Sequence, residues 1–186
     1  MAVESKSLPL GTIAPYFCLR DVVSGIKYTM NHVRGPKGMV IYFICNHCPY
    51  VIHVRQELVK VAQDYMPKGI GFAAISSNDV ERYPEDSPEK MKQVAQEFGF
   101  PFPYFYDETQ EVARDYQAAC TPDIFVFDGY LRLYYHGQLD DARPGNNVPI
   151  TGASLRLALD SLLEGKSPPE IQKPCVGCSI KWKEQN

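Results

Sequence analysis

The chain has 186 residues, which is the size of one domain and enough to bury a hydrophobic core without disulfide staples. Its 19 basic and 22 acidic residues give a formal net charge of -3, which argues against nucleic acid as a partner. No stretch reaches the roughly 18 apolar residues needed to cross a bilayer, and the N-terminus lacks the charged start and apolar run of a secretion signal. We therefore expect a cytoplasmic protein that contacts neither a membrane nor nucleic acid.

Six cysteines occupy positions 18, 45, 48, 120, 175 and 178. They are too few in a chain this long for a disulfide-stapled miniprotein. In a reducing compartment, such cysteines are more often catalytic or metal-binding than permanently bridged. Their spacing and local context must decide between these roles.

The first half of the chain predicts a hairpin and then a strand that leads into a helix. Residues 16–19 and 26–28 form the hairpin, after a polar lead-in. Residues 39–44 are six apolar or aromatic residues, typical of a strand buried on both faces. A helix follows from Pro49, a residue suited to the first helical position, and Pro67 and Gly69 end it.

Between this strand and helix lies a Cys-x-x-Cys pair, Cys45-Asn46-His47-Cys48. Helix N-termini favour anions, and a protonated His47 would add positive charge, so both are expected to lower the pKa of Cys45. Cys45 would then be the attacking sulfur and Cys48 the resolving one. The alternatives are two buried, inert cysteines or half of a zinc site, but the strand-to-helix position favours redox chemistry.

A second buried strand at residues 70–75 completes a β-α-β unit, which places the cysteine pair at the carboxyl edge of the sheet, where ligands usually bind. The polar loop 76–90 leaves the same edge and should border the site. Its charged residues are expected to form a solvated surface. They are Asp79, Glu81, Arg82, Glu85 and Asp86.

The remaining elements complete one α/β domain over residues 1–165. We expect helices from Ser87 to about residue 98, over 107–116 with Asp107 as cap, and over 154–163, with an extended connection at 100–106. Strands at 124–127 and 131–136 should form a hairpin around Asp128-Gly129, and a loop with Asp140, Asp141 and Arg143 should hold a surface ion pair. Residues 166–186 form a tail with a second Cys-x-x-Cys, Cys175 to Cys178, and no strand before it.

Three segments resemble the thioredoxin superfamily, and more closely its redoxin branch, which is grouped with the AhpC/TSA peroxiredoxins. They are the entry segment 11–19, the turn Cys45-Asn-His-Cys48-Pro49, and Cys120-Thr121-Pro122-Asp123 before an apolar strand. The resemblance covers nearly the whole chain and extends to an uncharacterised bacterial group with the same 139–145 loop and 177–183 ending. It implies a thioredoxin-like fold, in which helices flank a central mixed β-sheet, with an N-terminal hairpin and a C-terminal tail added.

The same resemblance implies roles for the residues around the cysteine pair. The Thr121–Pro122 bond would be cis, with the Pro122 ring packed against the two sulfurs. The backbone of Thr121 would be free to pair with an extended substrate segment. Asn46 and Pro49 would join Thr121 in contacting substrate.

A thiol-disulfide oxidoreductase is the function that follows. Cys45 would form a mixed disulfide with a protein or small-thiol substrate, and Cys48 would then release the reduced product. The reaction needs an unidentified electron donor but no cofactor or metal beyond the redox-active disulfide. The buried aspartate that moves protons in thioredoxins is missing from strand 39–44, so His47, Glu57 or a carboxylate of loop 76–90 would take its place.

Two other functions stay open. Cys48-Pro49 aligns with the Cys-Pro of the peroxidatic turn, but Ile41 and Cys45 stand where that turn carries proline and threonine, which predicts a weak peroxidase. Copper binding by the two cysteines and His136 is the other alternative, because cuprous ion prefers thiolates.

The tail cysteines also have three possible roles. Cys175 and Cys178 are first expected to be structural, next to serve as a redox relay to the first pair, and last to complete a zinc site with Cys45 and Cys48.

Overall fold

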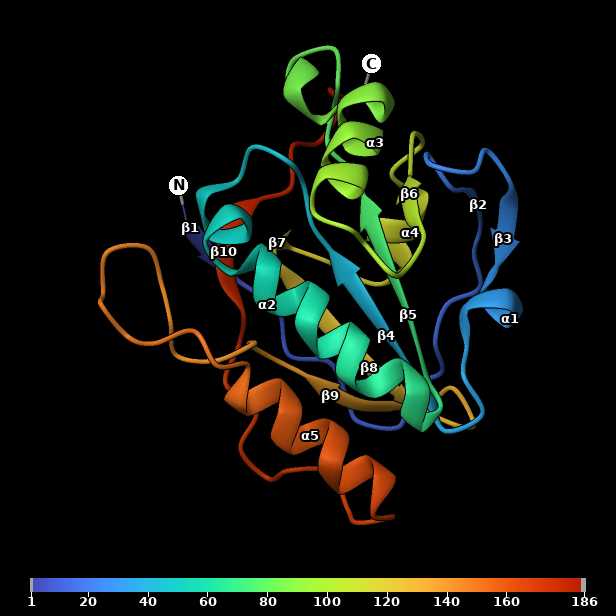
Figure 1. Cartoon of the computed structure of the whole chain (residues 1–186), viewed down its shortest axis with the longest axis vertical. Helices are drawn as coiled ribbons and strands as arrows, with labels where there is room; N and C mark the ends of the chain where they lie inside the picture. Colours follow the sequence, from blue (N-terminus) through green and yellow to red (C-terminus); the bar gives the residue numbers. More distant parts are fainter. Residues whose placement is uncertain (1, 185–186) are drawn as a thin grey trace.

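A five-stranded mixed sheet forms the centre of the computed structural model, which describes residues 2–184 (Figure 1). Its order is β6 (Tyr104–Tyr106), β5 (Ile70–Ser76), β4 (Gly38–Phe43), β8 (Asp123–Asp128) and β9 (Leu133–His136). β4 runs parallel to β5 and antiparallel to β8. The predicted thioredoxin-like α/β fold, with helices flanking a mixed sheet, is confirmed.

Every residue of β4 is buried, as its unbroken apolar sequence predicts. Alternate side chains enter two separate hydrophobic clusters, one on each face of the sheet. Helices α2 (Pro49–Tyr65), α3 (Pro88–Glu97) and α5 (Ala153–Leu163) cover one face. Helices α1 (Met30–Val33) and α4 (Glu111–Asp115) contribute to the other.

Helix α2 begins and ends close to its predicted limits. Cys48 is the N-cap residue and Pro49 is the first helical residue, where a missing N–H costs no hydrogen bond. A short 3-10 turn, η1 (Met66–Lys68), follows, and Gly69 ends it with φ 96°, a conformation that glycine adopts without steric cost. The cysteine pair therefore lies at the N-terminal end of α2, where Cys48 is the N-cap residue.

Two segments differ from the prediction. The expected connection at 100–106 contains β6, which pairs in parallel with β5. The expected helix at 107–116 is shortened to α4, because Gln110 has φ 62° and the chain turns there before the helix begins. Asp107 still satisfies the helix start, since its carboxylate accepts from the backbone N–H of Ala113 at 3.0 Å. The predicted hairpin is present as β2 (Cys18–Arg20) and β3 (Lys27–Thr29).

The tail contains a strand that the sequence analysis did not predict. β10 (Val176–Ser179) lies between β1 (Ala2–Glu4) and β7 (Cys120–Thr121) in an antiparallel three-stranded sheet. The chain then continues past the 76–79 segment, where Lys181 donates from its backbone N–H to Asn78 Oδ1 at 2.9 Å. The Arg114 guanidinium carbon lies 5.2 Å from the centre of the Trp182 ring, and Trp182 is 38% exposed. No helix within residues 2–184 is long and apolar enough to span a membrane.

Candidate active site

Cys45 and Cys48 lie where β4 ends and α2 begins, and both are free thiols. They are 2% and 0% exposed. Thr121 contacts both sulfurs: its hydroxyl oxygen lies 3.5 Å from Cys45 Sγ, and its carbonyl oxygen accepts from Cys48 Sγ at 3.2 Å. Cys45 and Cys48, the predicted redox pair, therefore join the turn between β4 and α2 to strand β7.

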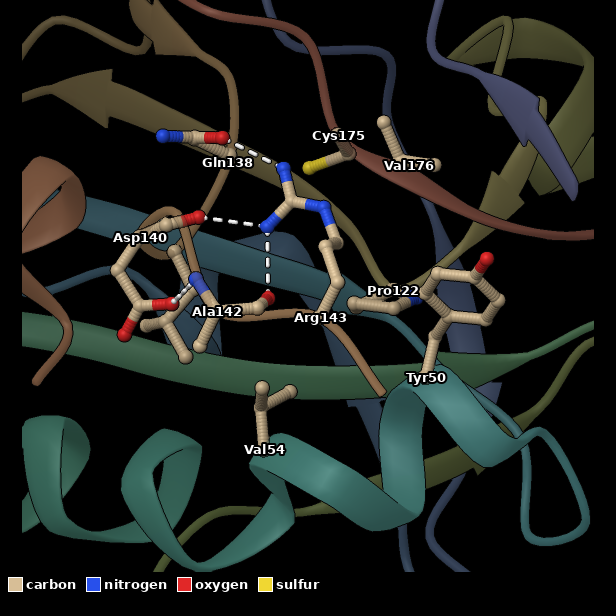
Figure 2. A pocket seen from close by; sticks show the side chains of 10 residues that line it. Tyr50, Val54, Pro122, Gln138, Asp140, Ala142, Arg143, Cys175 and Val176 are labelled. Carbon is tan, nitrogen blue, oxygen red and sulfur yellow. Dashed lines mark hydrogen bonds between the residues drawn. The ribbon is translucent and has the colours of Figure 1, made fainter. Parts of the chain in front are cut away.

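The peptide bond between Thr121 and Pro122 is cis, as the resemblance implied. Pro122 lines a small cleft of about 20 Å³ beside Tyr50 and Val54 of α2 (Figure 2). In Figure 2 the Arg143 side chain lies between this proline and the Gln138 side chain, and it donates to Gln138 Oε1 at 2.6 Å. The cleft has room for about one water molecule.

Asp140 and Arg143 do not form the predicted surface ion pair. Asp140 is 3% exposed, and its carboxylate accepts from the backbone N–H groups of Thr151 and Gly152 at 2.8 and 2.7 Å. The Arg143 guanidinium donates to the carbonyl of Asp140 rather than to its carboxylate. Both side chains thus hold the 138–152 loop in place, because buried backbone donors and acceptors need partners.

The electrostatics of the pair differ from the prediction for Cys45. The pKa of the Cys45 thiol is raised well above its usual range, first by its hydrogen bond to Cys48, then by burial and by the negative charge of Asp86. The pKa of Cys48 is lowered to about 4, first by the hydrogen bond from Cys45, with smaller help from Cys178 and the Val51 N–H, while burial opposes it. The Thr121 side chain also lowers the pKa of Cys48. The N-terminus of α2, where Cys48 is the N-cap residue, favours the same negative charge. The first thiolate of the pair is therefore centred on Cys48.

Asp86 has an environment that the sequence did not predict. It was expected in a solvated loop, yet it is 0% exposed. Its Oδ1 accepts from the backbone N–H of Asn46 at 2.8 Å and of His47 at 3.3 Å, and its Oδ2 accepts from Asn78 Nδ2 at 2.9 Å. Oδ2 also lies 2.6 Å from His47 Nδ1. A carboxylate of loop 76–90 thus holds the turn between the two cysteines, and it lies close enough to exchange a proton there.

The side chains of His47 and Asn46, the other residues of the predicted turn, also make specific contacts next to this carboxylate. The His47 ring stacks on Tyr83 at 5.4 Å, and its side chain is 28% exposed. The Asn46 side chain donates to the Glu85 carbonyl at 2.9 Å and accepts from the Tyr104 hydroxyl at 3.1 Å. His47 therefore lies beside Cys45 with part of its side chain exposed, while Asn46 is buried.

Glu57, a candidate proton-transfer group, is engaged elsewhere. Its Oε1 accepts from Arg156 Nη2 at 2.8 Å, so it joins α2 to α5. The Cys45 sulfur instead shares a cluster with His47 and Asp86, in which one atom from each residue lies within 4.8 Å of the others. Of the three candidates, His47 and the loop carboxylate are the ones near the sulfur.

The edge of Thr121 is not free, in contrast to the prediction. β10 occupies it, with Cys178 directly opposite Thr121 and Ser179 opposite Cys120. Gly177 makes this close approach possible, because a Cβ atom there would lie 1.9 Å from the Thr121 carbonyl oxygen. The position expected for an extended substrate therefore holds the protein's own tail.

The structure does not bring together the ligand sets predicted for copper and zinc. His136 is buried, and its Nε2 lies 2.7 Å from Asp123 Oδ1, so it is committed to that carboxylate. The Cys175 thiol donates to the Gly137 carbonyl at 2.9 Å. Among residues 2–184, no three cysteines bring their sulfurs within 4.8 Å of one another.

Comparisons with known proteins agree with this architecture. A protein from Geobacillus kaustophilus described as an uncharacterized conserved protein is 60% identical over 100% of this chain and 98% of its own, with a TM-score of 0.98. A hypothetical protein from Sinorhizobium meliloti is 43% identical over 98% of this chain and 99% of its own, with a TM-score of 0.95. The thioredoxin domain of a thiol-disulfide oxidoreductase from Bacteroides vulgatus, 20% identical over 73% of this chain and 92% of its own, has the same fold with a TM-score of 0.61.

No curated protein matches the chain. Residues 10–136, which run from the entry segment to the end of β9, match the AhpC/TSA family. This range contains β4, α2, both cysteines of the first pair and the cis-proline. The chain belongs to the AhpC/TSA family and has the redoxin form of the thioredoxin fold.

Proposed function

We propose that the protein is a thiol-disulfide oxidoreductase that uses Cys45 and Cys48 as its redox pair. The observation that carries the proposal is that both free thiols contact Thr121 at the cis-proline, at the N-terminus of α2. A helix N-terminus stabilises one thiolate, and the neighbouring thiol stabilises it further by donating a hydrogen bond. This arrangement supports reversible exchange between a dithiol and a disulfide.

Cys45 is the sulfur we assign to the mixed disulfide. Cys48 is enclosed by α2, by the Thr121 carbonyl and by β10, whereas Cys45 adjoins His47, whose side chain is 28% exposed. As the Cys45 thiol loses its proton to the His47–Asp86 pair, its sulfur attacks a substrate disulfide and expels one substrate thiolate. The Cys48 thiolate then attacks Cys45, which breaks the bond to the substrate and forms the Cys45–Cys48 disulfide. The second substrate sulfur leaves as a thiolate and takes up the proton held by the His47–Asp86 pair.

Single-cysteine variants test both the activity and this order. Cys45→Ser should abolish the reduction of insulin disulfides, because Cys48, enclosed by α2 and β10, cannot form a mixed disulfide with a protein substrate. Cys48→Ser should accumulate mixed disulfides, since the resolving step is lost. Insulin reduction that survives in Cys45→Ser would overturn the proposal, and mixed disulfides that accumulate in Cys45→Ser but not in Cys48→Ser would reverse the two roles.

A peroxidase reaction at Cys48 is a second candidate, favoured by the lowered pKa of this thiol. Its thiolate would attack a peroxide oxygen to give a sulfenic acid and an alcohol or water, and Cys45 would condense with the sulfenic acid to form the disulfide and water. Peroxide consumption faster than insulin reduction, lost in Cys48→Ser, would favour this candidate.

A further inference from the structure

The thiol of Cys178 lies beside the redox pair, although it follows Cys48 by 130 positions in the chain. Strand β10 brings it there, since Cys178 is the direct partner of Thr121, whose carbonyl receives the Cys48 hydrogen bond. Helix α2 also packs against β10. Cys48 and Cys178 therefore both lie against Thr121, Cys48 through a hydrogen bond and Cys178 through strand pairing.

The other tail cysteine is placed differently. Cys175 is 2% exposed, and its thiol donates to the Gly137 carbonyl at 2.9 Å, outside β10. Cys120 faces inward too, and its sulfur lies 3.5 Å from the Pro122 carbonyl. Cys178, in contrast, is half-buried and lies in β10 directly opposite Thr121.

We propose that Cys178 is a third redox thiol, which forms a disulfide with Cys48 in exchange for the Cys45–Cys48 disulfide. This inference rests on the proposed function of the first pair. In this arrangement Cys178 of β10 occupies the position at which an added substrate strand would pair with Thr121.

The reaction is an internal exchange. In the oxidised protein the Cys178 thiolate attacks Cys48 Sγ, the bond between Cys48 and Cys45 breaks, and Cys45 leaves as a thiolate that takes up the proton lost by Cys178. One disulfide is broken and one is formed, so no external oxidant or reductant is consumed. The product has Cys45 reduced while Cys48 stays oxidised.

The charges around Cys178 make this exchange depend on the state of Cys48. The pKa of Cys178 is raised to about 11, first by burial and then by its hydrogen bond to Cys48 and the negative charge of that thiolate, while Lys181 lowers it. When Cys48 is part of a disulfide it carries no charge, so two of the causes that raise the pKa are removed. Cys178 is therefore a poor nucleophile next to reduced Cys48 and a better one next to oxidised Cys48.

Disulfide mapping of the Cys45→Ser variant tests the proposal. The folded full-length protein is treated with oxidised glutathione, quenched with acid, alkylated with N-ethylmaleimide and mapped by mass spectrometry after digestion. Glutathione first forms a mixed disulfide with Cys48, and Cys178 then displaces it as reduced glutathione. The expected product is a disulfide-linked peptide pair that joins Cys48 to the tail.

No Lys or Arg separates Cys175 from Cys178, so matched variants identify the partner. In the Cys45→Ser background, Cys178→Ser should abolish the linked peptides and Cys175→Ser should leave them unchanged. Recovery of Cys48 as a glutathione adduct with Cys178 alkylated would overturn the proposal, as would linkage that is lost with Cys175→Ser instead.

Oxidised protein with Cys45 intact gives a second measurement, which does not depend on the folding of Cys45→Ser. A population with Cys45 alkylated and Cys48 protected should be present, and Cys178→Ser should remove it. Protein that reduces insulin without forming this population refutes the role of Cys178 alone. Protein that forms it but does not reduce insulin refutes the proposed function of the pair.

Discussion

Asp86→Asn should both destabilise the protein and change the acidity of the redox pair. The asparagine can keep one oxygen toward the backbone N–H groups of Asn46 and His47, which Oδ1 holds now. Its NH₂ group then replaces Oδ2 and faces another donor, Asn78 Nδ2. Asn78 cannot turn around without cost, because its Oδ1 accepts from the Lys181 backbone N–H at 2.9 Å.

The loss of one hydrogen bond to a charged acceptor, at a site that is 0% exposed, costs about 1.5–3 kcal/mol. For a chain of this length that lowers Tm by roughly 3–12 °C. The pKa of Cys45 should fall, since the negative charge of Asp86 is one of the causes that raise it. Thermal unfolding followed by circular dichroism measures the first effect, and the pH dependence of thiol alkylation in Cys48→Ser measures the second.

Glu85→Gln is the matched control, because the neighbouring side chain is exposed and only its backbone carbonyl binds Asn46. We expect it to change the free energy of unfolding by less than about 0.5 kcal/mol. If Asp86→Asn unfolds at the temperature of the unmodified protein, or if the control loses as much stability, the role given to this buried carboxylate is wrong.

Two other predictions concern the tail strand and the thiolate. Gly177→Ala should destabilise the protein by about 1–3 kcal/mol, because the new Cβ atom would lie 1.9 Å from the Thr121 carbonyl oxygen. Ser179→Ala on the same strand is its control, and equal urea midpoints for the two variants would contradict the close approach. The pKa of about 4 at Cys48 predicts that ultraviolet thiolate absorbance persists as the pH falls from 8 to 6, where an ordinary thiol with a pKa of about 8.5 has lost it. This absorbance should disappear in Cys48→Ser. If it persists in Cys48→Ser and is lost in Cys45→Ser, the thiolate belongs to Cys45 and the assignment to Cys48 is wrong.

The sequence was sufficient to predict the central fold, because the decisive patterns are local. Six apolar residues in a row indicate β4, and Pro49 followed by apolar steps of three and four indicates α2. The cysteine pair falls between them. Its placement at the sheet edge therefore followed from the order of the elements.

The buried carboxylate and the tail strand depend on contacts between distant residues, which local patterns do not encode. Asp86 lies in a polar, proline-containing loop and becomes buried only because that loop folds over residues 45–47. β10 is four residues long and is stabilised by β1 and β7, its partners from far along the chain. A sequence signal was present at Gly177, since glycine inside a strand often marks close approach of another backbone.

The position of Trp182 gives the tail its own spectroscopic reporter. It is the single tryptophan of the chain, and it follows β10 by three residues, stacked near Arg114 at the surface of the domain. Tryptophan emission therefore reports on the attachment of the tail rather than on the core beneath α2. A shift in this emission without loss of the circular dichroism signal would identify release of the tail from an otherwise folded protein, so the two signals together separate local opening at the redox site from global unfolding.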